Sequence, residues 1–279
     1  MQVLARISLL NDEEFMRVLD AILHLFFEDK TLLELRGSLI IRKLCVLLDA
    51  KSIYLSLATI LQGTGEYCLE NAEPILVSER LYFRSIVVQT LSCILLTARE
   101  LDGLRLQLRS CLKSGASQGA IDVFVTLFGC WCHNPVSTLA LCLIAQAYQL
   151  SSSLIDLFPD VSITVGFLVQ VDKLVQLLES PVFLQLRLHL LDVHDTAQHP
   201  FLLKTMYGLL MLLPQSAAYA TLNGRLATIS TLQMHMHNLG SASPLKSSIP
   251  SAPDLQNQLL NTFRSTQSLH ANCAHQTAS

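Results

Sequence analysis

The sequence predicts an all-α protein, an α-solenoid built as an array of antiparallel helices and followed by a disordered C-terminal tail. Three observations predict this fold. Apolar residues recur with helical spacing along most of the chain, helix-start and helix-stop signals are dense, and the connections between expected helices are short. No convincing strand pattern is present. Short connections favour antiparallel neighbours, and roughly ten to twelve helices without an exact sequence period indicate degenerate repeats.

The composition indicates that much of the surface is covered. The chain has 279 residues, of which 51% are hydrophobic and 15% charged, with a mean hydropathy of +0.43. An ordinary soluble domain has roughly 25% charged residues. A bilayer, a second subunit or another part of the same chain is the expected cover. The net charge is −3 and no block of Lys and Arg is present, so no nucleic-acid partner is expected.

The first half of the chain is predicted to contain four helices. The first two begin at capping boxes, whose side chains satisfy backbone donors of the first helical turn. These boxes pair Asn11 with Glu14 and Thr31 with Glu34. The second helix is expected over 32–48. A loop follows, and two further helices are expected from Ser78 to about Thr97, and over 101–112, where Gly115 ends the last one.

Proline marks the helix starts in the second half. Asn134-Pro135 and Ser180-Pro181 each place a capping side chain before a proline at the first helical position. Residues 167–178 carry one apolar and one polar face. Serine and proline concentrate in 240–253, which predicts a disordered linker, and a short amphipathic helix is expected over 254–264. The expected organisation is a helical part over 1–112, a second part over 113–227, and a mostly disordered tail over 228–279.

The nearly chargeless stretch 115–155 is the most unusual part of the sequence. Asp122 is its only charged residue. A transmembrane span needs ~20 apolar residues, and His133, Asn134 and Pro135 divide the stretch into shorter runs. Flanking Lys and Arg anchors are also missing. The pattern therefore predicts two central helices, buried on most sides, that meet at Asn134-Pro135.

Metal, cofactor and catalytic sites are not expected. Cys130, Cys132 and His133 have ligand chemistry, but residues at i and i+2 point to different faces of a helix and no second ligand pair lies nearby. No nucleophile-elbow, phosphate-binding-loop, dinucleotide-binding or zinc-protease motif is present. The chain is therefore not predicted to be an enzyme. Eight cysteines in apolar helical patterns and no signal peptide fit a reducing cytosol.

Four segments in the same order resemble one known family. They are LRGSLIIR at 35–42, WCHNPVST at 131–138, VDKLVQL at 171–177 and YGLLMLLPQS at 207–216. They resemble the C-terminal region of the vacuole-morphology scaffold of the PIKfyve-type lipid-kinase complex. The resemblance covers roughly Phe15 to Arg225. Each segment alone is a weak signal, but the four together are specific.

The resemblance implies a non-catalytic, HEAT- or armadillo-like scaffold that joins a phosphatidylinositol 3-phosphate 5-kinase to its opposing Sac-type 5-phosphatase. Such a scaffold lies on the cytosolic face of endosomal or vacuolar membranes, where it is peripheral. In that family, the C-terminal region binds the phosphatase and self-associates, so a homo-oligomer is expected. The family's long N-terminal repeat array has no counterpart in this sequence, which leaves the kinase contact open.

A partner-binding and assembly surface is expected at eight positions within the resembling segments and beside them. They are Trp131, His133, Asn134, Asp172, Lys173, Arg187, Tyr207 and Gln215. The alternative is that most of them are structural: Asn134 caps a helix, Trp131 packs in the core and Arg187 is a solvated charge. Two other functions remain open from the residues, a helical-repeat trafficking adaptor without a lipid-kinase link and an integral membrane protein.

Overall fold

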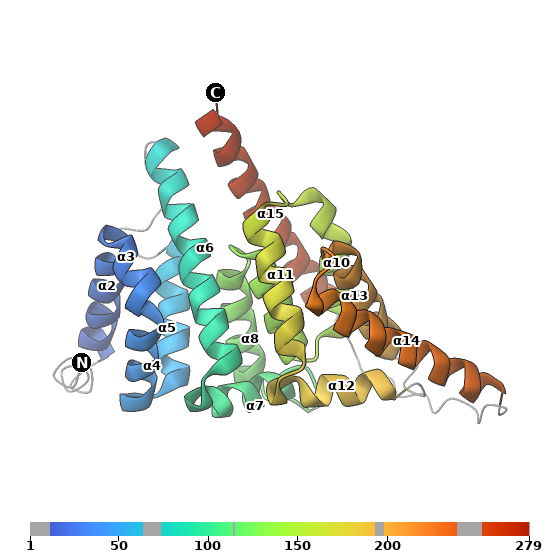
Figure 1. The fold of residues 1–279 in the computed structure, drawn as a ribbon. Helices are drawn as coiled ribbons and strands as arrows, with labels where there is room; N and C mark the ends of the chain where they lie inside the picture. The colour runs from blue at the N-terminus through green and yellow to red at the C-terminus, as the bar shows by residue number, and fades with distance from the viewer. Residues whose placement is uncertain (1–11, 64–73, 114, 193–197, 239–252, 279) are drawn as a thin grey trace.

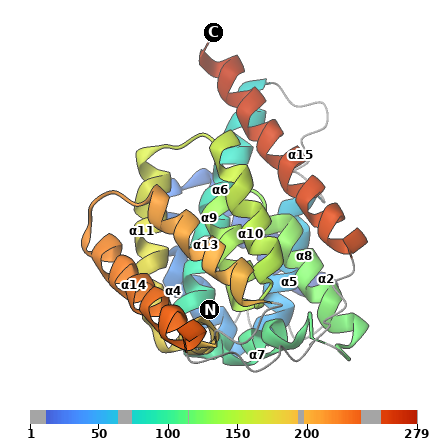
Figure 2. The same ribbon diagram turned by 90° about the vertical axis from the view of Figure 1, so that its right-hand side faces the viewer.

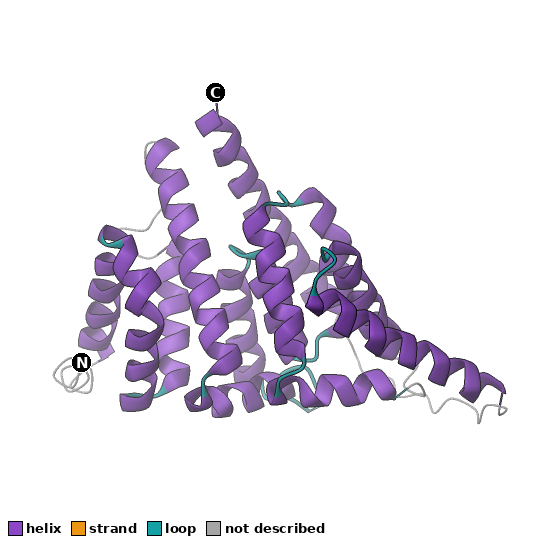
Figure 3. Ribbon diagram, in the orientation of Figure 1, coloured by secondary structure: helices purple, strands orange, loops and turns teal. Residues whose placement is uncertain are grey.

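The computed structural model describes residues 12–63, 74–113, 115–192, 198–238 and 253–278. Within these ranges all regular elements are helices (Figures 1 and 3). The prediction of an all-α protein is thus confirmed. The capping box at Asn11 and most of the expected linker at 240–253 lie outside the described residues.

The first half of the chain forms helical elements of 3 to 24 residues. In order they are α2 (Asp12–Glu28), α3 (Lys30–Leu32), the π-helix η1 (Leu33–Gly37), α4 (Ser38–Leu47), α5 (Ala50–Gly63), α6 (Pro74–Thr97), the 3-10 turn η3 (Arg99–Leu101) and α7 (Asp102–Ser110). Helix α6 begins at Pro74, four residues before the expected start at Ser78. Proline at the first position costs the helix no hydrogen bond, which explains the earlier start.

The second half begins with shorter helices and ends with two long ones. In order they are α8 (Gln118–Trp131), α9 (Pro135–Ile144), α10 (Tyr148–Leu157), η4 (Phe158–Asp160), α11 (Val165–Leu178), η5 (Pro181–Phe183), α12 (Leu184–Leu191), α13 (His199–Leu212), α14 (Ala217–Asn238) and α15 (Pro253–Ala278). In Figure 1, α7 and α12 lie across the lower ends of the upright helices. Helix α15 crosses obliquely in Figures 1 and 2 and packs on α6, α8 and α10.

One continuous hydrophobic core connects the helices. Its buried residues extend from Val18 in α2 to Phe263 in α15. The core continues without interruption across the boundary expected at residues 112 and 113, where Leu108 and Cys111 join Ala120 and Val123 in the same cluster. The chargeless helices α8 and α9 lie at its centre, because nearly every residue of α9 is buried. Burial on most sides thus explains the lack of charge in this stretch.

Helix starts are fixed by side-chain caps, only some of which were expected. The Asn134-Pro135 start is confirmed: the Asn134 side chain accepts a hydrogen bond from the Ser137 backbone N–H at 2.9 Å. The capping box expected at Thr31 is wrong. Asp29 caps α3 instead, and its carboxylate accepts from the Leu32 N–H at 3.0 Å and from the Thr31 hydroxyl at 2.6 Å. An aspartate two residues earlier competes successfully because its charge strengthens both bonds.

The chargeless stretch contains three helices rather than the two expected. Gln146 adopts a left-handed backbone with φ of 59° and separates α9 from α10. Its N–H donates to the carbonyl of Leu143 at 3.3 Å, and the Ala147 N–H donates to that of Cys142 at 2.9 Å. These two bonds make a Schellman C-cap, a motif that usually uses glycine. The sequence lacks that glycine signal, so the break was missed.

The end of the chain is more helical than expected. Helix α14 continues to Asn238, and the short helix expected over 254–264 is instead the 26-residue α15. The prediction of a mostly disordered tail over 228–279 is therefore wrong for both helices. The physical reason is that α15 buries Leu259, Leu260 and Phe263 against the rest of the protein, which stabilises a helix beyond its own propensity.

Within the described residues, no single helix is long and apolar enough to cross a membrane. One pair, Leu76–Thr97 with Arg99–Ser110, meets the length and composition criteria together, with a bend of 88° between its two parts. Among all the residues that the structure describes, no three or more His, Cys, Asp or Glu side chains lie close enough together to hold a metal ion.

Candidate partner-binding site

Trp131 lies in the core rather than on a surface. Its side chain is fully buried at the end of α8, and its ring lies 6.1 Å from that of Tyr54 in α5. The Trp131 carbonyl accepts a hydrogen bond from the Thr138 hydroxyl at 2.7 Å, which ties α8 to α9. The indole N–H finds no acceptor within the described ranges. The expectation that Trp131 contacts a partner therefore does not fit this structure, because neighbouring helices cover the whole side chain.

Asn134 and His133 are also buried, beside α6 and α15. Asn134 caps α9, and its amide nitrogen faces the Ser85 hydroxyl at 3.4 Å. His133 Nδ1 lies 3.0 Å from His270 Nε2, so that one ring donates to the other. In this structure Asn134 thus caps a helix and His133 packs against α15.

The two histidines are held neutral. Burial, followed by the nearby His270 and Arg84, lowers the pKa of His133 to about 3. Burial, together with Arg84, lowers the pKa of His270 to about 4. A neutral pair can share one hydrogen bond, whereas a protonated pair would place two charges in a poorly solvated site. The neutral pair thus joins the turn between α8 and α9 to α15.

Further contacts complete the seam between α15 and the body of the protein. The Gln267 side chain donates to the Cys132 carbonyl at 2.6 Å, and the Gln256 side chain donates to the Ser153 hydroxyl at 3.4 Å. Between them lie the buried Leu259, Leu260 and Phe263. Helix α15 thus covers the face made by α6, α8 and α10.

The other expected residues lie around α11, α12, α13 and α14. Asp172 in α11 accepts from the Ser216 hydroxyl and from the Gln176 side-chain amide, both at 2.6 Å. The first of these bonds fixes the connection between α13 and α14. Lys173 beside it is exposed, and so is Gln215 in that connection. Tyr207 in α13 is partly exposed, and its hydroxyl lies 3.0 Å from the Ser230 hydroxyl in α14.

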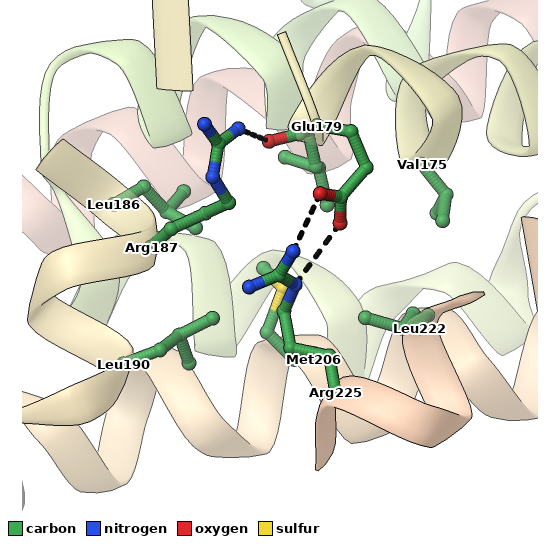
Figure 4. Close-up of a pocket in the computed structure, with 9 residues that line it drawn as sticks. Val175, Glu179, Leu186, Arg187, Leu190, Met206, Leu222 and Arg225 are labelled. Atoms are coloured by element: carbon green, nitrogen blue, oxygen red, sulfur yellow. Dashed lines mark hydrogen bonds and ion pairs between the residues drawn. The ribbon is translucent and has the colours of Figure 1, made fainter. Parts of the chain in front are cut away.

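Arg187 ties α12 to the end of α11. Its guanidinium donates to the Leu178 carbonyl and, at 2.8 Å, to the Ser180 carbonyl. Figure 4 shows Arg187 beside Glu179 and Arg225. Close to it, Arg225 of α14 makes a two-point ion pair with Glu179, with Nε 3.0 Å from Oε1. Arg187 is therefore not only a solvated charge, because it satisfies two carbonyls at a helix end.

A hollow of about 270 Å³ opens between α12 and α14. Its lining includes Arg187, Leu191, Thr221, Arg225, Thr228 and Ile229. On α12 beside it, Leu184, Leu188 and Leu191 are each about half exposed, whereas Leu186 and Leu190 are buried. A short helix with apolar residues on both faces is unusual in a surface position. We call the hollow and these three exposed leucines the α12–α14 face.

Comparison with known proteins places most of the chain in one family. A family model described as "Vacuolar protein 14 C-terminal Fig4p binding" matches residues 30–229. The Protein VAC14 homolog of Arabidopsis thaliana is 43% identical over 227 residues, which cover 81% of this chain and 28% of the relative. The chain belongs to the Vac14 family.

Two fungal proteins agree with this assignment. The Protein VAC14 homolog of Schizosaccharomyces pombe is 39% identical over 213 residues (76% of this chain, 24% of the relative). Vacuole morphology and inheritance protein 14 of Saccharomyces cerevisiae is 34% identical over 230 residues (82% and 23%). The chain thus spans about a quarter of the length of these relatives. No solved structure matches it significantly. The resemblance drawn from the four segments is confirmed.

The Vac14 match includes the α12–α14 face but not α15, the helix that covers α6, α8 and α10. Residues 30–229 include the α12–α14 face and the helices under α15, whereas α15 itself lies beyond the matched residues. The face over α6, α8 and α10 is thus part of the family region but is covered in this structure by a helix from outside it.

Several residues of these faces were not expected from the sequence. His270 and Gln267 are more than 130 positions from the turn that they contact, so no local pattern reveals the pairing. The leucines at 184, 188 and 191 do have a signal, since their i, i+4 and i+7 spacing places them on one helix face, opposite Leu186 and Leu190. Glu179 and Arg225 carry no signal that separates them from solvated charges.

Proposed function

We propose that this chain is the phosphatase-binding part of a non-catalytic scaffold, which assembles and regulates a phosphatidylinositol 3-phosphate 5-kinase complex. Its partner is a Sac-type 5-phosphatase of the Fig4 kind. A scaffold that holds a kinase and its opposing phosphatase together controls both the synthesis and the turnover of phosphatidylinositol 3,5-bisphosphate.

One observation supports this function above all others. The matched region, residues 30–229, is the part of the Vac14 family whose description names Fig4p binding. It includes nearly all of the packed helices from α3 to α14. A binding role also suits the chemistry, because the ionisable side chains discussed in the two faces pair with each other or satisfy backbone carbonyls.

The wider assembly belongs to the same proposal. The helices form a segment of an α-solenoid, in which 1–112 is HEAT-like and 113–227 carries phosphatase binding and self-association. The scaffold lies on the cytosolic face of endosomal or vacuolar membranes as a peripheral protein. The chain also forms homo-oligomers, consistent with its high proportion of hydrophobic residues, 51%. Contact with the PIKfyve-type kinase involves the assembled scaffold rather than this chain alone.

Co-purification tests the phosphatase contact. The tagged chain, residues 1–279, is expressed together with the cognate Sac-type phosphatase, with a full-length Vac14 relative as the positive control. We expect the phosphatase to remain with the chain through affinity and size-exclusion steps. If the phosphatase remains with the full-length relative but not with this chain, the proposed function is overturned for this chain.

A further inference from the structure

Three leucines on α12 face away from the core. Leu184, Leu188 and Leu191 are 51%, 54% and 50% exposed and lie on one side of the helix, because they are spaced by four and three residues. Leu186 and Leu190 on the other side are already buried in the core. The core packing of α12 is therefore complete without the exposed leucines. Contiguous exposed apolar residues of this kind mark interaction sites in folded proteins.

The neighbouring hollow adds positive charge to this apolar strip. Among its lining residues, Arg187 and Arg225 are charged and none is acidic. Glu179, which lines the smaller adjoining cavity, engages Arg225 through Nε and Nη2. The two carbonyl bonds of Arg187 use Nη1. Other N–H groups of both guanidinium groups thus remain outside these bonds, and arginine in such a position favours a carboxylate.

The opposite face of the family region is not open in the same way. Helix α15 covers α6, α8 and α10 with buried apolar side chains and with hydrogen bonds to Cys132 and His133. A partner that bound there would first have to displace α15. The α12–α14 face requires no such displacement, since its leucines are exposed in the folded chain.

We propose that the α12–α14 face is the docking surface for an amphipathic segment of the Sac-type phosphatase. That segment places leucine-like side chains on Leu184, Leu188 and Leu191 and an acidic side chain in the hollow beside Arg187 and Arg225. This inference rests on the proposed function and adds the location and the chemistry of the contact. Apolar anchors beside a charge-assisted hydrogen bond are the usual centre of such an interface.

A matched pair of double variants tests the apolar part. Leu184→Ser with Leu188→Ser removes two leucines spaced i, i+4 from the face. Leu35→Ser with Leu39→Ser removes an equally spaced and more exposed pair at the other end of the chain, where the exposed fractions are 83% and 68%. Each full chain is titrated against the purified phosphatase, and circular dichroism verifies its helix content. We expect the first pair to weaken binding by about tenfold or more and the second to change it by less than about twofold.

The charge is tested in the same way. Arg225→Glu reverses a cation whose side chain is 34% exposed and pairs with Glu179, and Lys204→Glu reverses a cation that is 55% exposed and pairs with Asp156. We expect about a tenfold loss of affinity for the first variant and little change for the second, because only Arg225 faces the proposed carboxylate.

The outcomes separate the docking surface from the function. If the unaltered chain binds the phosphatase and the α12 leucine variant binds equally tightly, the docking surface is wrong and the proposed function stands. Equal losses at both leucine pairs also overturn the surface. If light scattering shows that the α12 variant loses self-association but keeps phosphatase affinity, the occupant is a second copy and the proposal fails. An unaltered chain that does not bind overturns both.

Discussion

The two faces of this protein use similar side chains in opposite ways. On the covered face, Leu259, Leu260 and Phe263 of α15 are buried by helices of the same chain. On the α12–α14 face, leucines of similar size remain half exposed. The covered face has already obtained its hydrophobic stabilisation within one molecule, whereas the open face can obtain it only from another. The comparison indicates that substitutions on the first should change folding and substitutions on the second should change binding.

The largest expected effect is on the covered face. Phe263→Ala removes a ring that is 1% exposed, and such truncations cost about 3–5 kcal/mol. Because α15 packs on the body through this strip, we expect its docking, rather than the whole core, to lose this free energy. Hydrogen exchange should show faster exchange over 253–278 while α8 and α9 stay protected. Phe263→Leu, as the control, should retain most of the protection. Unchanged exchange in Phe263→Ala would mean that the seam contributes little.

Acid should weaken the same seam. The folded-state pKa values of His133 and His270, about 3 and about 4, lie below the ordinary value of 6.5. Between about pH 3 and pH 6.5 the undocked or unfolded state therefore binds more protons than the folded state. The stability that depends on the neutral pair is complete above pH 6.5 and decreases as the pH falls below that value. At pH 5.5 each imidazole that regains its ordinary pKa costs about 1.4 kcal/mol, up to about 3 kcal/mol for both.

Hydrogen exchange of α15 at pH 7.5 and pH 5.5, corrected for the intrinsic rate, measures this loss. His270→Gln is the control, because it keeps a hydrogen-bonding side chain but removes one titrating group. We expect its pH dependence to be about half that of the unaltered chain. A dependence equal in both chains would assign the effect to other groups.

Gly208 lies at a close contact between two helices, each of which also packs against a helix of one of the two faces. Helices α10 and α13 pack closely at Gly208, where an added Cβ would lie 2.3 Å from Ile155 Cγ2. Helix α10 also contacts α15, and α13 also contacts α14. Gly208→Ala should therefore destabilise the chain by about 1–3 kcal/mol through overpacking, and urea unfolding measures this change. Adding Ile155→Ala removes the clashing methyl group, and if it restores no stability, close packing is not the cause.

The sequence predicted the helices of the fold better than the contacts between residues that are distant in the chain. Asn134-Pro135 correctly predicted the start of α9, because the cap and the proline act on neighbouring residues. The break at Gln146 was missed because its left-handed backbone forms without the usual glycine, and its side chain donates to Gln185 of α12, a contact that no local pattern reveals. The length of α15 was underestimated for a related reason: its stability depends on partners more than 100 residues away.

The residues of the candidate site show the same difference between local patterns and tertiary placement. Burial separates Trp131, His133 and Asn134 from any partner in this structure, although they belong to one of the most recognisable segments of the sequence. Asp172, Arg187 and Tyr207 each make a hydrogen bond among α11 to α14, but none of them supplies the exposed apolar area of the α12–α14 face. A distinctive segment thus indicated the family more reliably than it indicated the surface.

The smallest effect on folding is expected where we expect a large effect on binding. Leu188→Ser changes a side chain that is 54% exposed, so the free energy of unfolding should change by less than about 0.5 kcal/mol. Leu190→Ser, two residues away, replaces a side chain that is 1% exposed and should cost several-fold more, because it also buries a hydroxyl. Urea unfolding of the two variants compares both faces of one helix. A large loss of stability in Leu188→Ser would show that the leucines support the fold, and the contrast between the covered and open faces would then fail.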